Sequence, residues 1–136
     1  MVKPTFLLDT NTWIYTLKGQ PANLVARLGE IDPDMVAFCS IVKAELLTGA
    51  YRYGNPEKRV AVLHELFGRH RSLSFDDAAA EAYGRIRHAL EMTGQTIGPM
   101  DMLIAAIALA NDLVMVTHNT NEFSRITDLE VVDWVG

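Results

Sequence analysis

Short apolar segments alternate along this chain with longer segments whose apolar residues recur at helical spacing. Such an alternation is typical of an α/β domain built on a parallel sheet. We therefore expect a three-layer α/β/α fold with roughly five parallel strands. The strands are predicted over residues 5–9, 35–39 and 113–117, and on weaker patterns over residues 72–75 and 130–133.

Three of the longer segments carry clear helix signals. Residues 56–70 are amphipathic, with apolar positions on one face and charged positions on the other. A second helix is expected to begin after Asp76 or Asp77, which are good capping residues, and to end at Gly94. A third is expected to begin near Pro99, because proline is favoured at the first position of a helix.

Composition predicts a single domain over residues 1–136. Of these 136 residues, 49% are hydrophobic and 21% are charged, which is sufficient for a core. The only cysteine, Cys39, permits no internal disulfide, which fits a reducing compartment. Asp9 interrupts the apolar stretch near the N-terminus, so no signal peptide is expected, and no apolar run has the length of a membrane span. We therefore expect a cytoplasmic protein without membrane contact.

Two aspartates stand where ligands bind in parallel sheets, which is beyond the carboxyl ends of the strands. Asp9 ends the first predicted strand, and its other interpretation is a helix cap worth about 1 kcal/mol. Asp101 lies in the first turn of a helix that is apolar on every side, so this helix is expected to be buried. Pro99 already marks the start of that helix, and a buried carboxylate would need a partner such as a cation.

A third acid, Glu45, lies in a helix predicted over residues 41–53 with Ser40 as its cap. Taken alone, Glu45 is equally well explained as an ordinary exposed glutamate. However, Asp9, Glu45 and Asp101 are all predicted at or shortly beyond the carboxyl ends of three neighbouring strands, or in the helices leading from them, so one crevice can hold all three. The sequence therefore predicts a shared acidic site.

Scattered carboxylates without histidine or cysteine at ligand spacing suit Mg²⁺ or Mn²⁺ rather than Zn²⁺. A carboxylate-held Mg²⁺ can activate water against a phosphodiester, which is nuclease chemistry. The formal net charge of −5 argues by itself against nucleic acid binding, but a bound cation inverts the local field. The four histidines are interpreted as surface or loop residues.

The chain resembles the PIN-domain toxins called VapC in the order and spacing of four motifs. These are Leu7-Leu8-Asp9-Thr10-Asn11, then Ser40 with Glu45-Leu46 and Gly49, then Gly98-Pro99-Met100-Asp101 with Ile104-Ala105-Ala106, and finally Val116-Thr117-His118-Asn119 with Glu122-Phe123. The resemblance runs from the first strand to Trp134. It implies a Mg²⁺-dependent endoribonuclease, the toxin half of a toxin–antitoxin pair.

Further expectations follow from the same resemblance. It implies inhibition by a cognate VapB-like antitoxin that inserts a segment into the active-site groove, and a homodimer that joins the antitoxin in a larger complex. An RNA substrate is implied, and tRNA is the expected one, because the VapC toxins that the chain most resembles act on tRNA. A tRNA loop is the expected target, since sequence-specific recognition of RNA usually acts on unpaired loops. Cleavage of tRNA would block translation.

The resemblance also assigns site residues. Asp9, Glu45 and Asp101 match the acidic triad of the family, with Asp9 and Asp101 as the expected direct ligands. Many PIN domains have a fourth aspartate where this chain has Asn119, so a second metal is in question and Glu122 is a candidate substitute. Thr10, Asn11, Ser40 and Thr117 are expected to support the ligands, although turn and cap chemistry explains each of them equally well.

Two other functions remain open from the sequence. The first is a phosphoryl-transfer enzyme with Asp9 as nucleophile, but such folds need a second acid two positions later, where this chain has Asn11. The second is a non-catalytic α/β binding module in which the acids are only caps. Intact RNA and absent divalent-ion binding would favour this second alternative.

Overall fold

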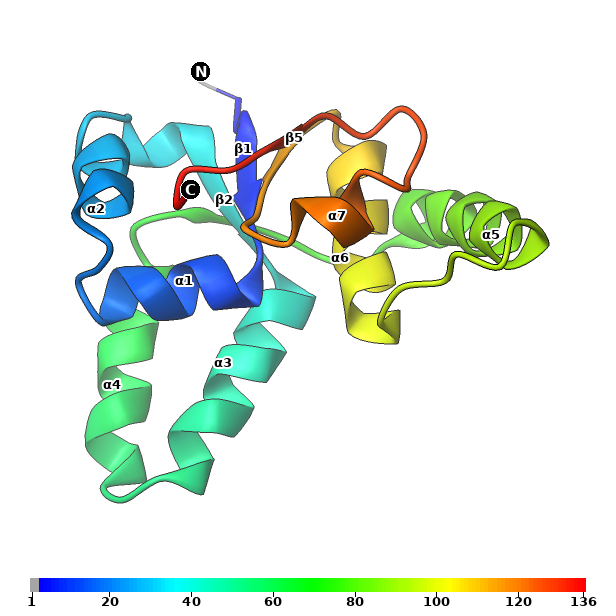
Figure 1. Cartoon of the computed structure of the whole chain (residues 1–136). Coiled ribbons are helices and arrows are strands. Elements are labelled where there is room, and N and C mark those ends of the chain that lie inside the picture. Colours follow the sequence, from blue (N-terminus) through cyan, green and yellow to red (C-terminus); the bar gives the residue numbers. More distant parts are fainter. Residues whose placement is uncertain (1–2) are drawn as a thin grey trace.

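The computed structural model describes residues 3–136, and a five-stranded parallel sheet lies at its centre. The strand order is β3-β2-β1-β4-β5 (Figure 1). The strands are β1 (Phe6–Leu8), β2 (Val36–Cys39), β3 (Arg71–Leu73), β4 (Val114–Val116) and β5 (Val131–Val132). The predicted α/β class and parallel sheet are therefore confirmed.

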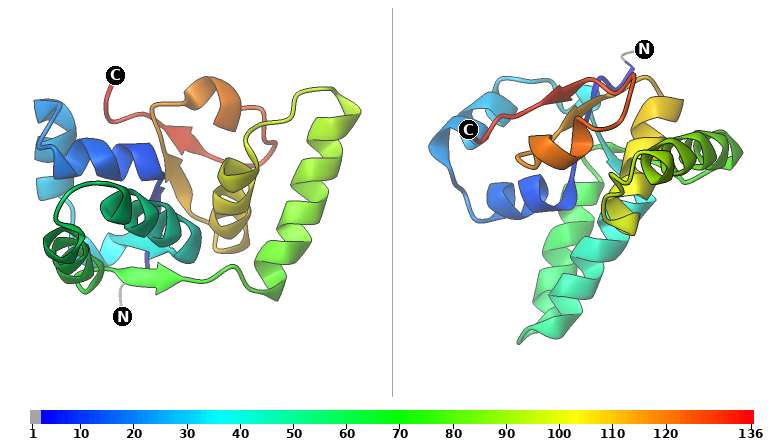
Figure 2. Two further views of the ribbon diagram at one scale, coloured as in Figure 1. Left: turned by 90° about the horizontal axis from the view of Figure 1, so that it is seen from below. Right: turned by 45° about the vertical axis from the view of Figure 1, so that its right-hand side comes forward.

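Helices cover the sheet on both sides. Helices α1 (Thr10–Leu17) and α2 (Ala22–Gly29) lie on one side, and α5 (Asp77–Met92) and α6 (Pro99–Ala110) lie on the other (Figure 2). Helices α3 (Ser40–Arg52) and α4 (Pro56–Phe67) pack side by side and extend below the sheet in Figure 1. The short helix α7 (Thr120–Phe123) follows β4, and a 3₁₀ turn over Pro33–Met35 precedes β2. No helix within residues 3–136 is long and apolar enough to span a membrane.

Apolar packing on both sides of the sheet holds the helices and strands near the predicted acids in place. Helix α6 is buried along most of its length, between the sheet and α5, as its continuous apolar sequence predicts. On the other side, the rings of Trp13 and Phe38 stack with their centroids 4.2 Å apart, and both side chains are fully buried. This contact anchors the start of α1 to β2.

Several predicted boundaries are confirmed, and others differ. Helix α6 begins at Pro99, and α5 is capped by Asp76, whose carboxylate accepts from the Ala79 N–H. The Ser40 cap was wrong, because Ser40 is the first helical residue and the extended Cys39 occupies the cap position. Strand β3 ends at Leu73 rather than at residue 75, since Phe75 turns away to pack against Tyr83.

Candidate active site

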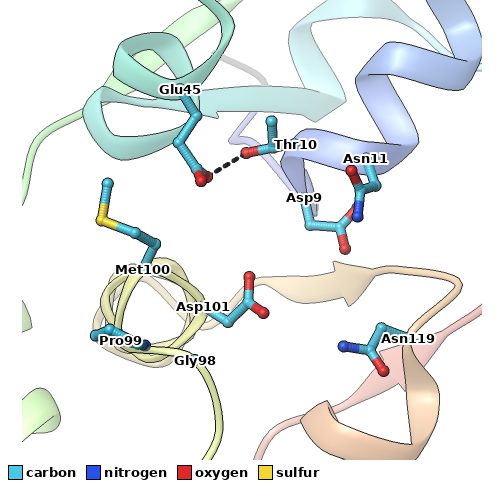
Figure 3. Close-up of a pocket in the computed structure, with 9 residues that line it drawn as sticks. All are labelled: Asp9, Thr10, Asn11, Glu45, Gly98, Pro99, Met100, Asp101 and Asn119. Atoms are coloured by element: carbon cyan, nitrogen blue, oxygen red, sulfur yellow. Dashed lines mark hydrogen bonds between the residues drawn. The ribbon is translucent and has the colours of Figure 1, made fainter. Parts of the chain in front are cut away.

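The three predicted acids lie around one pocket of about 310 Å³ at the carboxyl ends of the strands. Asp9 follows β1, Glu45 lies in α3 after β2, and Asp101 lies in the first turn of α6. Figure 3 shows the side chains of Asp9, Asp101 and Asn119 directed toward the same space. The complete lining is Asp9, Thr10, Asn11, Glu45, Gly98, Pro99, Met100, Asp101 and Asn119.

Asp9 is both a helix cap and a pocket residue. Its side chain is buried, and Oδ1 accepts from the Thr12 backbone N–H at 2.9 Å. Its Oδ2 accepts from the hydroxyl of the buried Thr117 at 2.6 Å. The two hydrogen bonds fix the carboxylate in one orientation and stabilise its charge, which suits a ligand better than a nucleophile.

Glu45 is held in a similar way from the neighbouring strand end. The Thr10 hydroxyl donates to Glu45 Oε1 at 2.6 Å, and the side chain of Glu45 is half-buried (Figure 3). Glu45 is therefore not the ordinary exposed glutamate that its helix alone would allow. The bond joins residues 35 positions apart and connects α1 to α3 at the pocket.

Asp101 is the acid with the most strongly perturbed titration. Burial, and after it the negative charges of Asp9, Glu45 and Glu122, together raise its pKa from 3.8 to about 6. Among the described residues that line this pocket there is no Lys or Arg to compensate the charge. A cation in the pocket would remove both penalties, since it would pair with the carboxylate that burial disfavours.

The donor set fits a hard divalent cation. The side chains offer three carboxylates and the Asn119 amide, which are the oxygen ligands that Mg²⁺ and Mn²⁺ prefer. As the side chains stand, no three His, Cys, Asp or Glu residues within residues 3–136 are grouped closely enough to hold one metal ion. Mg²⁺ keeps several of its own waters and needs only one or two direct carboxylates.

The remaining predicted residues divide into two groups. Thr10, Asn11 and Asn119 line the pocket, and Thr117 lies behind it, where its Oγ1 also accepts from the Asn119 backbone N–H at 2.9 Å. Ser40 is exposed, and neither it nor Glu122 is part of the lining, although the charge of Glu122 reaches Asp101.

Sequence reasoning did not assign a role to the apolar wall of the pocket. Gly98, Pro99 and Met100 form this wall, and Met100 remains 41% exposed. Their position immediately before Asp101 in the sequence could have indicated that they line the site. It was not used in this way because glycine and proline are common at the start of a helix for structural reasons.

The raised pKa of Asp101 predicts how the stability of the metal-free protein depends on pH. Because the folded-state pKa lies above the unfolded value of 3.8, the fold binds a proton that the unfolded chain has released. This contribution to stability is complete below pH 3.8 and is lost as the pH rises through about 6. For a partly exposed group we expect the loss to be about 1 kcal/mol.

Urea unfolding in EDTA between about pH 4 and 7 measures this loss as the difference between the wild type and Asp101→Asn. The asparagine variant should gain stability relative to the wild type as the pH rises. If the free energies of unfolding of the two proteins changed with pH in parallel, the raised pKa of Asp101 would be contradicted. Saturating Mg²⁺ at neutral pH should stabilise only the wild type, because a ligand that binds only the folded state raises its stability.

Comparison with known proteins assigns the class. A family model described as the PIN domain matches residues 6–129. This match covers nearly the whole chain. The chain belongs to the PIN-domain family.

Individual relatives within this family are VapC ribonucleases. The chain is 37% identical over 129 residues to the tRNA(fMet)-specific endonuclease VapC of Shigella flexneri, with 95% of this chain and 97% of that protein covered. It is 35% identical over 130 residues to ribonuclease VapC1 of Haemophilus influenzae, with the same two shares covered. Its structure matches DNA-bound VapBC from Salmonella typhimurium with a TM-score of 0.90, 37% identity, and coverage of 96% of this chain and 98% of that one. The predicted resemblance to VapC ribonucleases is confirmed.

Proposed function

We propose that this chain is a Mg²⁺-dependent endoribonuclease that acts as the toxin of a VapBC-type toxin–antitoxin pair. The observation that carries the proposal is the gathering of Asp9, Glu45 and Asp101 around one pocket whose described lining contains no Lys or Arg. An RNA phosphate would be repelled from such a pocket unless a cation lay between them. The names of the relatives, which are ribonucleases or endonucleases, support the substrate class.

In this proposal Asp9 and Asp101 would hold the metal directly, and Glu45 would contribute a third carboxylate to the same site. The Thr12 N–H and the Thr117 hydroxyl hold Asp9, and the Thr10 hydroxyl holds Glu45. Mg²⁺, or Mn²⁺ in its place, supplies an activated water and neutralises charge on the phosphoryl oxygens when it is bound. The Asn119 amide is placed to orient a water or a phosphate oxygen, with Thr117 beneath it.

The proposed substrate is tRNA, and the proposed inhibitor is a VapB-like antitoxin. The Shigella flexneri relative is named for tRNA(fMet), and the Salmonella typhimurium structure is a VapBC complex. A basic antitoxin segment would be attracted to the acidic pocket. Exposed Tyr51 and Tyr53 at the end of α3 offer aromatic surface for a homodimer within a larger complex. The site of action is the cytoplasm, where tRNA is used in translation.

Sequencing of RNA ends after brief induction of the chain tests the proposal. We expect new ends at a few positions in tRNA loops, and the same ends from purified protein with Mg²⁺ but not with EDTA. Asp9→Asn serves as the control, because it keeps a side-chain oxygen for the helix cap but weakens the metal site. Intact RNA with both Mg²⁺ and Mn²⁺, or equal cleavage by the variant, would show that the proposal is wrong.

A further inference from the structure

A second hollow of about 210 Å³ adjoins the acidic pocket. It is lined by Asp9, Asn11, Tyr15, His118 and Asn119. Asp9, Asn11 and Asn119 line both spaces, so the two are neighbouring parts of one surface. A nucleotide chain whose scissile phosphate lies at the acids would place an adjacent nucleotide in this second hollow.

The chemistry of the second hollow differs from that of the first. Three carboxylates line the acidic pocket, whereas Asp9 is the only one in the described lining of the second. The rest of this lining consists of two amides, a phenol and an imidazole. Neutral hydrogen-bonding groups of this kind contact the sugars and phosphates of nucleic acids. The second hollow is therefore better suited to the nucleic acid itself than to a metal.

His118 is held in one orientation by the end of the neighbouring strand. Its Nδ1 lies 3.0 Å from Asp133 Oδ2, and Asp133 Oδ1 accepts from the backbone N–H groups of Val135 and Gly136 at 2.8 and 3.1 Å. Burial acts to raise the pKa of Asp133, but these hydrogen bonds outweigh it and the pKa is lowered. Asp133 is therefore a carboxylate, and Nδ1 of His118 must carry the hydrogen in their shared bond.

This bond determines what the other ring nitrogen can do. In a neutral imidazole with the hydrogen on Nδ1, Nε2 is a hydrogen-bond acceptor. No hydrogen bond within residues 3–136 engages Nε2, and the side chain of His118 is 53% exposed. In this neutral form, the acceptor beside the acidic pocket requires a donor from the ligand, which a ribose hydroxyl supplies and a phosphodiester oxygen does not.

We propose that Nε2 of His118 accepts a hydrogen bond from the ribose 2′-hydroxyl of a nucleotide adjacent to the scissile phosphate, so that the second hollow selects RNA over DNA. The 2′-hydroxyl is the group by which a protein distinguishes the two nucleic acids at a given site. In this arrangement Asp133 is a positioning residue and His118 a binding residue. The inference rests on the proposed function, because it takes the acidic pocket as the site of cleavage.

The variant His118→Asn removes Nε2 but keeps a hydrogen-bond donor in the place of Nδ1. An asparagine amide can still donate to Asp133 from the place of Nδ1, but it has no atom in the place of Nε2. His118→Gln is the matched control, since its longer amide can offer an oxygen near the place of Nε2. Both changes are made in the otherwise wild-type chain, and binding is measured with Ca²⁺ in place of Mg²⁺, so that a cation still occupies the acidic pocket while the nucleic acid stays intact.

Fluorescence anisotropy with a labelled single-stranded RNA, and with the DNA of the same sequence, gives the preference for RNA. We expect His118→Asn to reduce this preference about fivefold, as the loss of one neutral hydrogen bond implies, with DNA affinity unchanged. His118→Gln should retain part of the preference. An equal loss of RNA and DNA affinity would indicate a contact to a base or to a phosphate instead and would overturn the proposal, as would no change in either affinity.

This experiment can contradict the role of His118 without contradicting the proposed ribonuclease function, and the reverse. Binding is measured without cleavage, so a wild type that fails to cut RNA would contradict the proposed function whatever the preference for RNA. Conversely, a wild type that cuts RNA while His118→Asn keeps its full preference would contradict only the role of His118. Calorimetric titration of Mg²⁺ into His118→Asn alone should match the wild type, because His118 does not line the acidic pocket.

Discussion

The Asp101→Asn variant is expected to fold normally and to lose Mg²⁺-dependent RNA cleavage by about a thousandfold or more. The amide has nearly the shape of the carboxylate but lacks the charge that binds the metal. Folding should not suffer, because the charge of Asp101 is already disfavoured by burial and by the other acids. Initial rates on a labelled tRNA, together with urea unfolding curves, measure the two effects on one protein sample.

Asp112→Asn is the matched control for this experiment. It makes the same chemical change at an exposed residue just beyond the other end of α6, and asparagine tolerates its positive φ of 54°. Activity within about twofold of wild type is expected, because a surface change away from the pocket seldom alters function. A well-folded Asp101→Asn protein that retains wild-type cleavage would remove Asp101 from the mechanism.

The second large effect is expected from Thr117→Val, which removes a hydroxyl from behind the pocket. Valine has the shape of threonine, but it cannot donate to Asp9 Oδ2 or accept from the Asn119 N–H. We expect Mg²⁺ affinity and cleavage to fall about 10- to 100-fold, as is typical when a group that orients a metal ligand is lost. The free energy of unfolding should fall by about 1 to 3 kcal/mol, because the buried carboxylate loses a partner.

Thr16→Val provides the comparison for Thr117→Val. The Thr16 hydroxyl donates only to the Thr12 carbonyl within the same helix, and Thr16 does not line the pocket. Calorimetric titration of Mg²⁺ into both variants separates the two roles. If Thr117→Val lost stability but bound Mg²⁺ as tightly as Thr16→Val, the hydroxyl would be structural and would not position Asp9.

The positions of Asp9 and Glu45 were predictable from the sequence because Asp9 follows β1 and Glu45 lies in the helix after β2, and parallel strands bring their carboxyl ends to one edge. Asp101 lies in α6, which follows α5 and leads into β4, so its place at the same edge depends on the packing of α6 against α5 and the sheet. The two interpretations of Asp9 also proved compatible, since one oxygen caps α1 while the carboxylate still faces the pocket. Local patterns were sufficient for Asp9 and Glu45.

Contacts between distant segments were not predictable in the same way. The bond from Thr117 to Asp9 joins residues 108 positions apart and depends on β1 lying beside β4. The pairing of His118 with Asp133 likewise depends on the register of β4 and β5. Helices α2 and α7 were not predicted; α2 has 8 residues and buries only Leu24, and α7 has 4 residues. Short elements of this kind are fixed by tertiary packing rather than by their own sequence.

The most direct test of the acidic site is a crystal of the chain soaked in Mn²⁺, with an anomalous difference map calculated near the manganese edge. We expect a peak in the pocket within direct bonding distance of both Asp9 and Asp101, with Glu45 beside it. The same soak of Asp101→Asn should weaken or remove the peak. Protein from dissolved crystals is assayed for RNA cleavage in Mn²⁺ as a control. If this protein is active while the manganese binds elsewhere and the pocket is empty, Asp9 and Asp101 are not the metal ligands.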